Sequence, residues 1–200
     1  DATAEQFRDQ FRDETGQIYL LGIDPYYYFR QTRNLINYGT VGTEVRNGEN
    51  FDAYKLAPLG AEIESNLHPY VGVLIYNIIG WFSNKSLMGS FFYVGALISA
   101  LAVIPAFFIG RRVGGNVGGF FAAWMLAFNI FFVSRTAGES SDTDAYNILL
   151  PLLIAWVFLE AMEHKDWKWY TGLSALAGLL IGLYAFAWTG WWFMLYFAVA

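Results

Sequence analysis

After residue 86 the chain consists mostly of apolar runs that are long enough to cross a lipid bilayer. Four of them cover about 87–109, 117–133, 145–162 and 173–188, and a fifth begins at 191–200. A helix that crosses a bilayer needs roughly 20 apolar residues, and its backbone must satisfy its own hydrogen bonds. Only 14% of the 200 residues are charged, against about 25% in an average soluble domain. This pattern predicts an all-α, polytopic helical membrane protein.

The first 85 residues are the polar part of the chain, and we expect a first external loop ahead of the membrane region, residues 86–200. Asp24 and Pro25 precede a run that ends at Gly39. Asp at an N-cap, proline at the first helical position and glycine past the end predict a surface-lying helix that starts at Asp24. Residues 40–66 should form a long irregular loop, whose length favours a function. The net charge of -5 comes mostly from this acidic segment, so no nucleic-acid partner is expected.

Basic residues in two loops predict the orientation of the chain in the membrane. Arg111 and Arg112 follow the first apolar run, and Lys165 and Lys168 follow the third. An even number of crossings separates these loops, and loops rich in Lys and Arg stay in the cytoplasm. The first external loop and the loop 134–144 are then expected to lie together on the extracytoplasmic side.

The loop 134–144 is a polar island between two apolar runs. Its Asp142 and Asp144 have the D-x-D spacing, which lets two carboxylates point at one hard cation such as Mg²⁺ or Mn²⁺. Asp24 is expected to face the same compartment and is a third candidate ligand. Asp24 and Asp142 also stand where a helix N-cap would, so capping remains open beside metal binding. Clustered carboxylates repel one another, and a divalent ion removes that repulsion.

Four other residues are candidates for weaker roles. Arg135 either snorkels at the end of an apolar run or brings a positive charge to the carboxylates or to an anionic substrate. Glu139 is interpreted as a solvated loop acid. His68 is either a turn histidine or a phosphate contact. Trp188 belongs either to an interfacial aromatic belt or to a lipid contact.

Two motifs in combination resemble those of oligosaccharyltransferase catalytic subunits. The first-loop acidic motif of that family is similar to Gly22-Ile23-Asp24-Pro25-Tyr26-Tyr27-Tyr28-Phe29-Arg30. The second-loop motif is similar to R-T-x-G-x-x-x-D-x-D, which runs from Arg135 to Asp144. The resemblance continues through Leu150-Pro151 and Lys165-Asp166, and so covers almost the whole chain. The acidic composition and the sequence Asp142-Thr143-Asp144 in the second-loop motif resemble the archaeal branch of that family.

This resemblance implies a metal-dependent membrane glycosyltransferase of the GT-C architecture. Such an enzyme transfers an oligosaccharide from a dolichyl phosphate or diphosphate carrier to the asparagine of Asn-x-Ser/Thr in an acceptor polypeptide, with Mn²⁺ or Mg²⁺. The resemblance implies catalytic roles for Asp24, Arg135, Asp142 and Asp144, of which the three aspartates would be metal ligands. Contacts with the lipid carrier would come from His68 and Trp188.

Two parts of the family's site have no counterpart in the sequence. These are a glutamate of a later external loop and a W-W-D-x-G motif that reads the acceptor, since Trp191-Trp192 is followed by Phe193. We therefore expect a fragment that is inactive alone. Another GT-C enzyme, such as a protein O-mannosyltransferase, is an alternative that Arg135 before the D-x-D disfavours. A transporter with an acidic external gate would need charges inside the apolar runs, which hold almost none.

Overall fold

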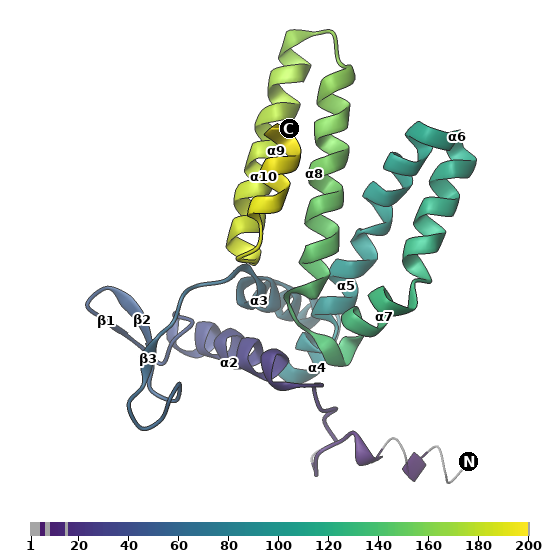
Figure 1. The fold of residues 1–200 in the computed structure, drawn as a ribbon. Coiled ribbons are helices and arrows are strands. Elements are labelled where there is room, and N and C mark those ends of the chain that lie inside the picture. The colour runs from purple at the N-terminus through teal and green to yellow at the C-terminus, as the bar shows by residue number, and fades with distance from the viewer. Residues whose placement is uncertain (1–4, 7–8, 15, 200) are drawn as a thin grey trace. The chain divides into compact units, whose positions relative to one another are not determined.

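The computed structural model describes residues 5–6, 9–14 and 16–199 (Figure 1). Two compact units divide the chain, and each is described by itself. The first unit contains residues 1–94 and 137–142, and the second contains residues 95–136 and 143–200. The elements in chain order are α2 (Ile23–Tyr38), β1 (Glu44–Arg46), β2 (Glu49–Asp52), β3 (Ala61–Glu62), α3 (Leu67–Gly80), α4 (Leu87–Phe91), α5 (Val94–Leu101), α6 (Val103–Ala127), α7 (Ile130–Thr136), η1 (Gly138–Ser140), η2 (Thr143–Ala145), α8 (Tyr146–Glu163), α9 (Trp167–Ala187) and α10 (Trp192–Val199).

Helix α2 carries Asp24 and lies between two glycines with positive φ. Gly22, with φ 87°, holds the N-cap position, and Gly39, with φ 73°, ends the helix in the left-handed conformation. The Gly39 N–H donates to the Leu35 carbonyl at 3.1 Å. The helix therefore starts one residue earlier than expected, and the N-cap assignment of Asp24 is wrong. Its carboxylate lies in the first turn, where the helix dipole favours a negative charge.

A small antiparallel sheet occupies the segment that we expected to be irregular. Its strands are ordered β1-β2-β3, and the β1–β2 register pairs Arg46 with Glu49. The two residues between them, Asn47 and Gly48, have φ 54° and 89°. Two positive φ values in a two-residue connection define a type I′ turn, for which Asn-Gly is the preferred sequence. The Asn-Gly pair is thus the sequence signal for a hairpin that the expectation of an irregular loop overlooked.

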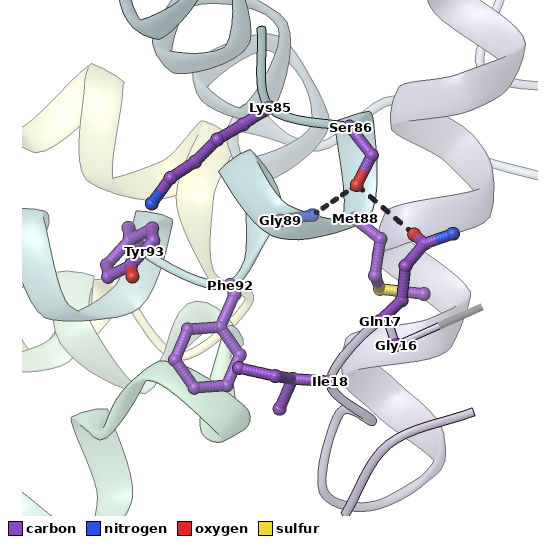
Figure 2. Close-up of a pocket in the computed structure, with 9 residues that line it drawn as sticks. All are labelled: Gly16, Gln17, Ile18, Lys85, Ser86, Met88, Gly89, Phe92 and Tyr93. Atoms are coloured by element: carbon purple, nitrogen blue, oxygen red, sulfur yellow. Dashed lines mark hydrogen bonds between the residues drawn. The ribbon is translucent and has the colours of Figure 1, made fainter. Parts of the chain in front are cut away.

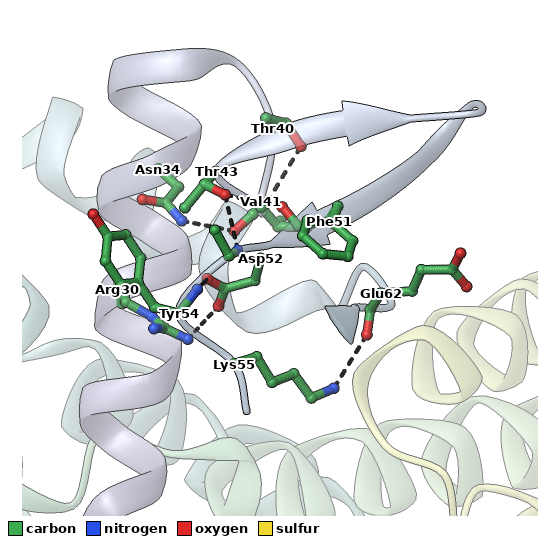
Figure 3. A network of polar contacts seen from close by, with 12 residues as sticks. Arg30, Asn34, Thr40, Val41, Thr43, Phe51, Asp52, Tyr54, Lys55 and Glu62 are labelled. Carbon is green, nitrogen blue, oxygen red and sulfur yellow. Dashed lines mark hydrogen bonds and ion pairs between the residues drawn. The ribbon is translucent and has the colours of Figure 1, made fainter. Parts of the chain in front are cut away.

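A buried ion pair anchors this sheet to α2 (Figure 3). Asp52, at the end of β2, has no exposed surface and pairs with Arg30 on α2. The second oxygen of the same carboxylate accepts the Tyr54 N–H at 3.0 Å. One turn further along α2, the Asn34 amide donates to the Val41 carbonyl at 3.1 Å. A buried carboxylate is stable only when it is paired and hydrogen-bonded, so these contacts fix the loop on the helix.

Helix α3 packs against α2 with very little space between them. Asn66 caps α3 by accepting the His68 N–H at 2.9 Å. The Thr32 hydroxyl lies 3.4 Å from the Pro69 carbonyl, and a Cβ on Gly72 would come within 2.8 Å of the same hydroxyl. Glycine at position 72 therefore permits the close approach of the two helices.

The start of α4 is tied to the N-terminal segment beside a small cavity of about 220 Å³ (Figure 2). The Ser86 hydroxyl donates to Gln17 Oε1 at 3.1 Å and accepts the Gly89 N–H at 3.1 Å. Ser86 is the N-cap residue of α4. One serine therefore caps the helix and holds the segment that leads to α2.

In the second unit the chain reverses direction inside the element labelled α6 (Figure 1). Gly115 has φ 62° and ψ -160°, a conformation that essentially only glycine adopts. The two arms then pack closely. A Cβ on Gly110 would lie 2.7 Å from the Gly118 carbonyl oxygen, and one on Gly119 would lie 2.7 Å from the Phe107 carbonyl oxygen. This reversal is the expected break between the first two apolar runs.

Helices α8 and α9 form a second hairpin, whose turn lies at the same end of the unit as the α6 reversal. Arg112, just before that reversal, donates to Glu160 Oε1 at 2.7 Å and pairs with Glu163. Glu163 is the last residue of α8, and the turn that follows it leads into α9. The two basic loops predicted to share one side of the membrane thus lie together within this unit.

Three helical stretches among the described residues are long and apolar enough to cross a membrane: Leu87–Ala127, Thr143–Glu163 and Trp167–Ala187. The first has 41 residues and includes the Gly115 reversal, so it contains two arms. The second arm ends at Ala127 instead of residue 133, because the helix is broken before α7 begins at Ile130. The all-α polytopic fold is confirmed, with the small sheet as an addition within residues 40–66.

We expect Gly115→Ala to lower the free energy of unfolding by about 1–3 kcal/mol, because a Cβ is strained at this backbone conformation. Gly114→Ala is the matched control. Gly114 has φ -128°, and a Cβ on either glycine would meet no atom within 4 Å. Thermal unfolding of the full-length protein in detergent measures the difference. Equal stability of the two variants would contradict the role of Gly115 in the turn.

Candidate functional site

A backbone hydrogen bond brings the two acidic segments of the first unit together. The Leu21 N–H donates to the Glu139 carbonyl at 2.7 Å. Leu21 lies three residues before Asp24, and Glu139 lies three residues before Asp142. Two segments that are far apart in the sequence are therefore adjacent three residues before each aspartate. Both carboxylates also belong to the same compact unit.

His68 makes the second connection to this loop. Its Nε2 lies 3.2 Å from the Ser141 carbonyl oxygen and 3.4 Å from the Ser141 hydroxyl. A carbonyl oxygen only accepts, so Nε2 carries the hydrogen. The ring has no exposed surface and contacts the edges or faces of Tyr28 and Phe91, with centroid distances of 5.2 and 5.3 Å. His68 therefore holds the residue immediately before Asp142.

Burial keeps His68 neutral. It lowers the pKa of the imidazole from 6.5 to about 4, and the hydrogen bond with Ser141 opposes this shift only in part. A neutral and fully buried ring offers no surface to a phosphate in this conformation. The expected phosphate contact of His68 stays a prediction, and the geometry supports a positioning role for this residue.

Gly138 and Ser141 are site residues that the sequence interpretation did not single out. A Cβ on Gly138 would lie 2.2 Å from a ring carbon of Phe92, so only glycine fits there without movement of the ring. Ser141 has no exposed surface. The signal for Gly138 was its place in R-T-x-G-x-x-x-D-x-D. Ser141 has no such signal, because its backbone carbonyl, common to every residue type, makes the closer contact.

Arg135 and Asp144 lie together in the second unit. Arg135 Nη1 is 3.4 Å from Asp144 Oδ2, and the arginine side chain is 79% exposed. A pair this long and this exposed contributes little to stability. Both residues line one pocket of about 400 Å³, between α7 and the start of α8. The arginine is therefore available to a further anionic group, as one of the two expected interpretations requires.

Trp188 ends α9 in the same unit. It is 36% exposed and lies at the C-cap of the helix. Its ring stacks on Tyr184, with the centroids 5.9 Å apart, and contacts Phe193 edge-on. Neither an aromatic belt nor a lipid contact is decided by this packing, so both interpretations of Trp188 stay predictions.

The structure does not gather the three predicted metal ligands into one cluster among its described residues. The described residues contain no group of three His, Asp or Glu side chains that is close enough to hold a metal ion. Asp24 and Asp142 belong to the first unit, whereas Asp144 belongs to the second. Carboxylate oxygens are the ligands that Mg²⁺ and Mn²⁺ prefer, so the donor chemistry fits. The convergence of the three aspartates stays a prediction.

Comparison with known proteins identifies the family. The family model described as "Oligosaccharyl transferase STT3, N-terminal" matches residues 2–200. The chain belongs to the STT3 family. The match covers both acidic segments and all the membrane helices, so the expected family is confirmed.

Two curated relatives of this STT3 chain come from methanogenic archaea. Both are named dolichyl-phosphooligosaccharide-protein glycotransferase. The Methanococcus voltae protein is 35% identical over 208 residues, which is 99% of this chain and 22% of the relative. The Methanocaldococcus jannaschii protein is 34% identical over 197 residues, which is 90% of this chain and 21% of the relative. The chain thus spans about a fifth of the length of these relatives.

Solved structures of the Archaeoglobus fulgidus oligosaccharyltransferase have the same fold as this STT3 chain. A complex of that protein with Zn and sulfate has a TM-score of 0.73 at 21% identity, over 96% of this chain and 25% of the other. A complex with an inhibitory peptide and a dolichol-phosphate has a TM-score of 0.72 at 22% identity, over 96% and 24%. This similarity confirms the polytopic helical fold expected from the apolar runs.

Replacing His68 by alanine should lower the free energy of unfolding by roughly 2–4 kcal/mol, because a buried ring and its hydrogen bond are lost. The matched control is His164→Ala, since His164 is exposed after the end of α8. Chemical or thermal unfolding of the full-length protein in detergent measures both changes. A His68 variant as stable as the His164 variant would exclude the positioning role.

The low pKa of His68 also predicts a pH dependence of stability. The folded protein holds the ring neutral down to about pH 4, whereas the unfolded chain protonates it below about pH 6.5. This contribution is therefore complete above pH 6.5 and declines as the pH falls from 6.5 towards 4. The difference in unfolding midpoint between the wild type and His68→Gln should shrink over that range. A difference that stays constant would contradict the assigned protonation.

Proposed function

We propose that the full-length protein to which this chain belongs transfers an oligosaccharide from a dolichyl phosphate or diphosphate carrier to the asparagine of Asn-x-Ser/Thr in acceptor polypeptides. The observation that carries this proposal is the STT3 match over residues 2–200, together with the Leu21–Glu139 bond between the two acidic segments. The names of the methanogen relatives support the carrier and the reaction. The peptide with an NVT sequon in an A. fulgidus structure supports the acceptor.

Asp24, Asp142 and Asp144 would hold a divalent ion, Mn²⁺ or Mg²⁺, and such an ion would offset negative charge on the departing phosphate. The carboxylate donor set and the A. fulgidus complex with Zn and sulfate support this assignment. Asp24 contributes from the first turn of α2, and Asp142 comes just before η2. The Leu21–Glu139 bond and the His68–Ser141 contact hold the segments that carry these two aspartates.

The residues of this chain have three tasks in the proposed reaction. The acceptor carboxamide is a weak nucleophile because its nitrogen lone pair is delocalised into the carbonyl. Asp24 and Asp142 accept hydrogen bonds from the amide N–H groups, and so favour rotation of the amide out of conjugation. Arg135 offers positive charge to the carrier phosphate. His68 and Gly138 keep the loop that carries Asp142 in place.

The acidic segments would lie on the extracytoplasmic side of the membrane. The observation in support is the Arg112–Glu160 contact, which places the Arg111-Arg112 turn beside the end of α8. Basic loops stay in the cytoplasm. Helix α7, which contains Ser134, lies an odd number of crossings away from that turn.

Single cysteines test this orientation, because the chain contains no cysteine of its own. Val113 is 90% exposed beside the basic turn, and Ser134 is exposed on α7, which leads into the loop 137–142. We expect Val113→Cys to react with a membrane-impermeant maleimide only from the cytoplasmic side, and Ser134→Cys only from the opposite side. Labelling of both cysteines from one side of sealed vesicles would contradict the predicted orientation.

In the full-length protein, Asp142→Asn should lower glycan transfer by roughly 10²-fold or more, because a charged group at the reacting centre is removed without a change of shape. It should also weaken Mn²⁺ binding. Glu139→Gln removes a charge from the same loop and is the control, since Glu139 is interpreted as a solvated acid. Transfer rates and Mn²⁺ titration measure both variants. Undiminished transfer by the Asp142 variant would refute its catalytic role.

A further inference from the structure

The pocket beside Arg135 contains more polar groups than the family motifs explain. Within the second unit it is lined by Arg135 and Asp144, by two asparagines, Asn129 and Asn147, and by apolar side chains that include Phe132. Asn147 lies in a membrane-spanning helix. Polar groups inside a span are costly in hydrocarbon, and they usually serve a function. The two asparagines therefore need an explanation.

Both asparagine oxygens already accept a hydrogen bond. Asn129 Oδ1 accepts the Phe132 N–H at 3.0 Å, which starts helix α7. Asn147 Oδ1 accepts from the Tyr184 hydroxyl at 3.2 Å. The group that remains on each amide is its N–H₂, which can only donate. The pocket is thus lined by three donor groups, with Asp144 as the carboxylate that already faces Arg135.

Tyr184 fixes the orientation of the Asn147 amide. The tyrosine ring has no exposed surface, comes from α9 and is stacked on Trp188. Because its hydroxyl contacts the Asn147 oxygen, the amide nitrogen is left as the group that can turn to the pocket. Tyr184 acts through Asn147 and is a positioning residue.

The chemistry of a matching ligand follows from these groups. Three donor groups beside one carboxylate, which already faces the arginine, favour an anion, and the arginine fork and amide N–H groups suit phosphate oxygens. The apolar walls, with Phe131 79% exposed and Phe132 beside it, suit a hydrocarbon chain. We propose that Asn147, oriented by Tyr184, donates a hydrogen bond to a phosphate borne on a long apolar chain in this pocket.

The phosphate could come from the isoprenoid carrier or from a membrane phospholipid. The carrier is the source that we assign, and this assignment rests on the proposed glycan transfer. Asn147 then contributes to specificity for the carrier head group, in addition to the residues of the two acidic motifs. The other part of the proposal, that this pocket binds a phosphate borne on an apolar chain, does not depend on the proposed glycan transfer.

The test uses the purified full-length protein with three variants that change shape very little. Asn147→Asp keeps the oxygen that accepts from Tyr184 and replaces the N–H₂ donor with a negative charge. Asn147→Leu removes both groups, and Tyr184→Phe removes only the orienting hydroxyl. Asn116→Asp is the matched control, because Asn116 is exposed at the α6 reversal, at the opposite end of the second α6 arm from the pocket residue Leu126.

We expect Asn147→Asp to raise the KM for the lipid-linked oligosaccharide about 10- to 100-fold and to weaken dolichyl phosphate binding equally. Tyr184→Phe should raise the same KM about threefold, and kcat should change little in either variant. Asn147→Leu should also raise this KM, without an added charge. It therefore decides the result if the aspartate variant does not fold. A purely structural role would lower the unfolding temperature of these variants and leave the KM unchanged, which would overturn the proposal.

Binding assays distinguish the source of the phosphate and the two levels of the proposal. Dolichyl phosphate and phosphatidylglycerol are titrated separately into the wild type and Asn147→Asp. Loss of affinity for phosphatidylglycerol alone would overturn the carrier assignment. If the full-length protein transferred no glycan while Asn147→Asp lost dolichyl phosphate binding, the lipid-phosphate site would stand and the proposed function would fail.

Discussion

The hydrogen bond between His68 and Ser141 is the contact on which the arrangement of the first unit depends. The loop 137–142 is flanked in the sequence by helices of the second unit, yet it contacts Leu21 and His68 of the first unit. A buried, neutral histidine and the Leu21–Glu139 backbone bond hold it there. Because both contacts use backbone carbonyls of the loop, the side chains of Glu139 and Asp142 take no part in them. At Asp52 the acidic side chain itself makes the contact, since its buried carboxylate pairs with Arg30 and anchors the sheet to α2.

The membrane fold could be predicted from the sequence because its signal is local. Long apolar runs, basic turns and a glycine past a helix end each report on their own neighbourhood. The helices, the break between the first two apolar runs and the end of α2 at Gly39 follow from them. The small sheet was missed although Asn47-Gly48 is an equally local signal. The reason is that three short strands within a polar segment give almost no hydrophobic periodicity, so the composition of residues 40–66 masked the turn.

Of the candidate site, only the carboxylate residues could be predicted from the sequence. Charge and span counting predicted that Asp24 and Asp142 share one side, and the structure places both in one unit through Leu21 and Glu139. The contacts that hold them could not be predicted, since Leu21, Glu139 and Ser141 contribute backbone groups that every residue possesses. His68 shows the converse case. Its side chain left a turn histidine and a phosphate contact open, and its burial by Tyr28, Phe91 and Ser141 could not be read from the sequence, because those neighbours come from distant segments.

In the second unit, hydrogen-bond donors and acceptors indicate a functional residue that no sequence motif contains. Arg135 and Asp144 were visible in the sequence as part of R-T-x-G-x-x-x-D-x-D, whereas Asn147 looked like one polar residue in an apolar helix. Its significance comes from Tyr184, which lies a whole helix hairpin away and occupies the amide oxygen. If the pair served only to join α8 and α9, small residues and apolar packing would do so without polar atoms in hydrocarbon. A tyrosine that leaves an amide donor beside an arginine instead forms half of an anion site, and the apolar walls determine what kind of anion enters it.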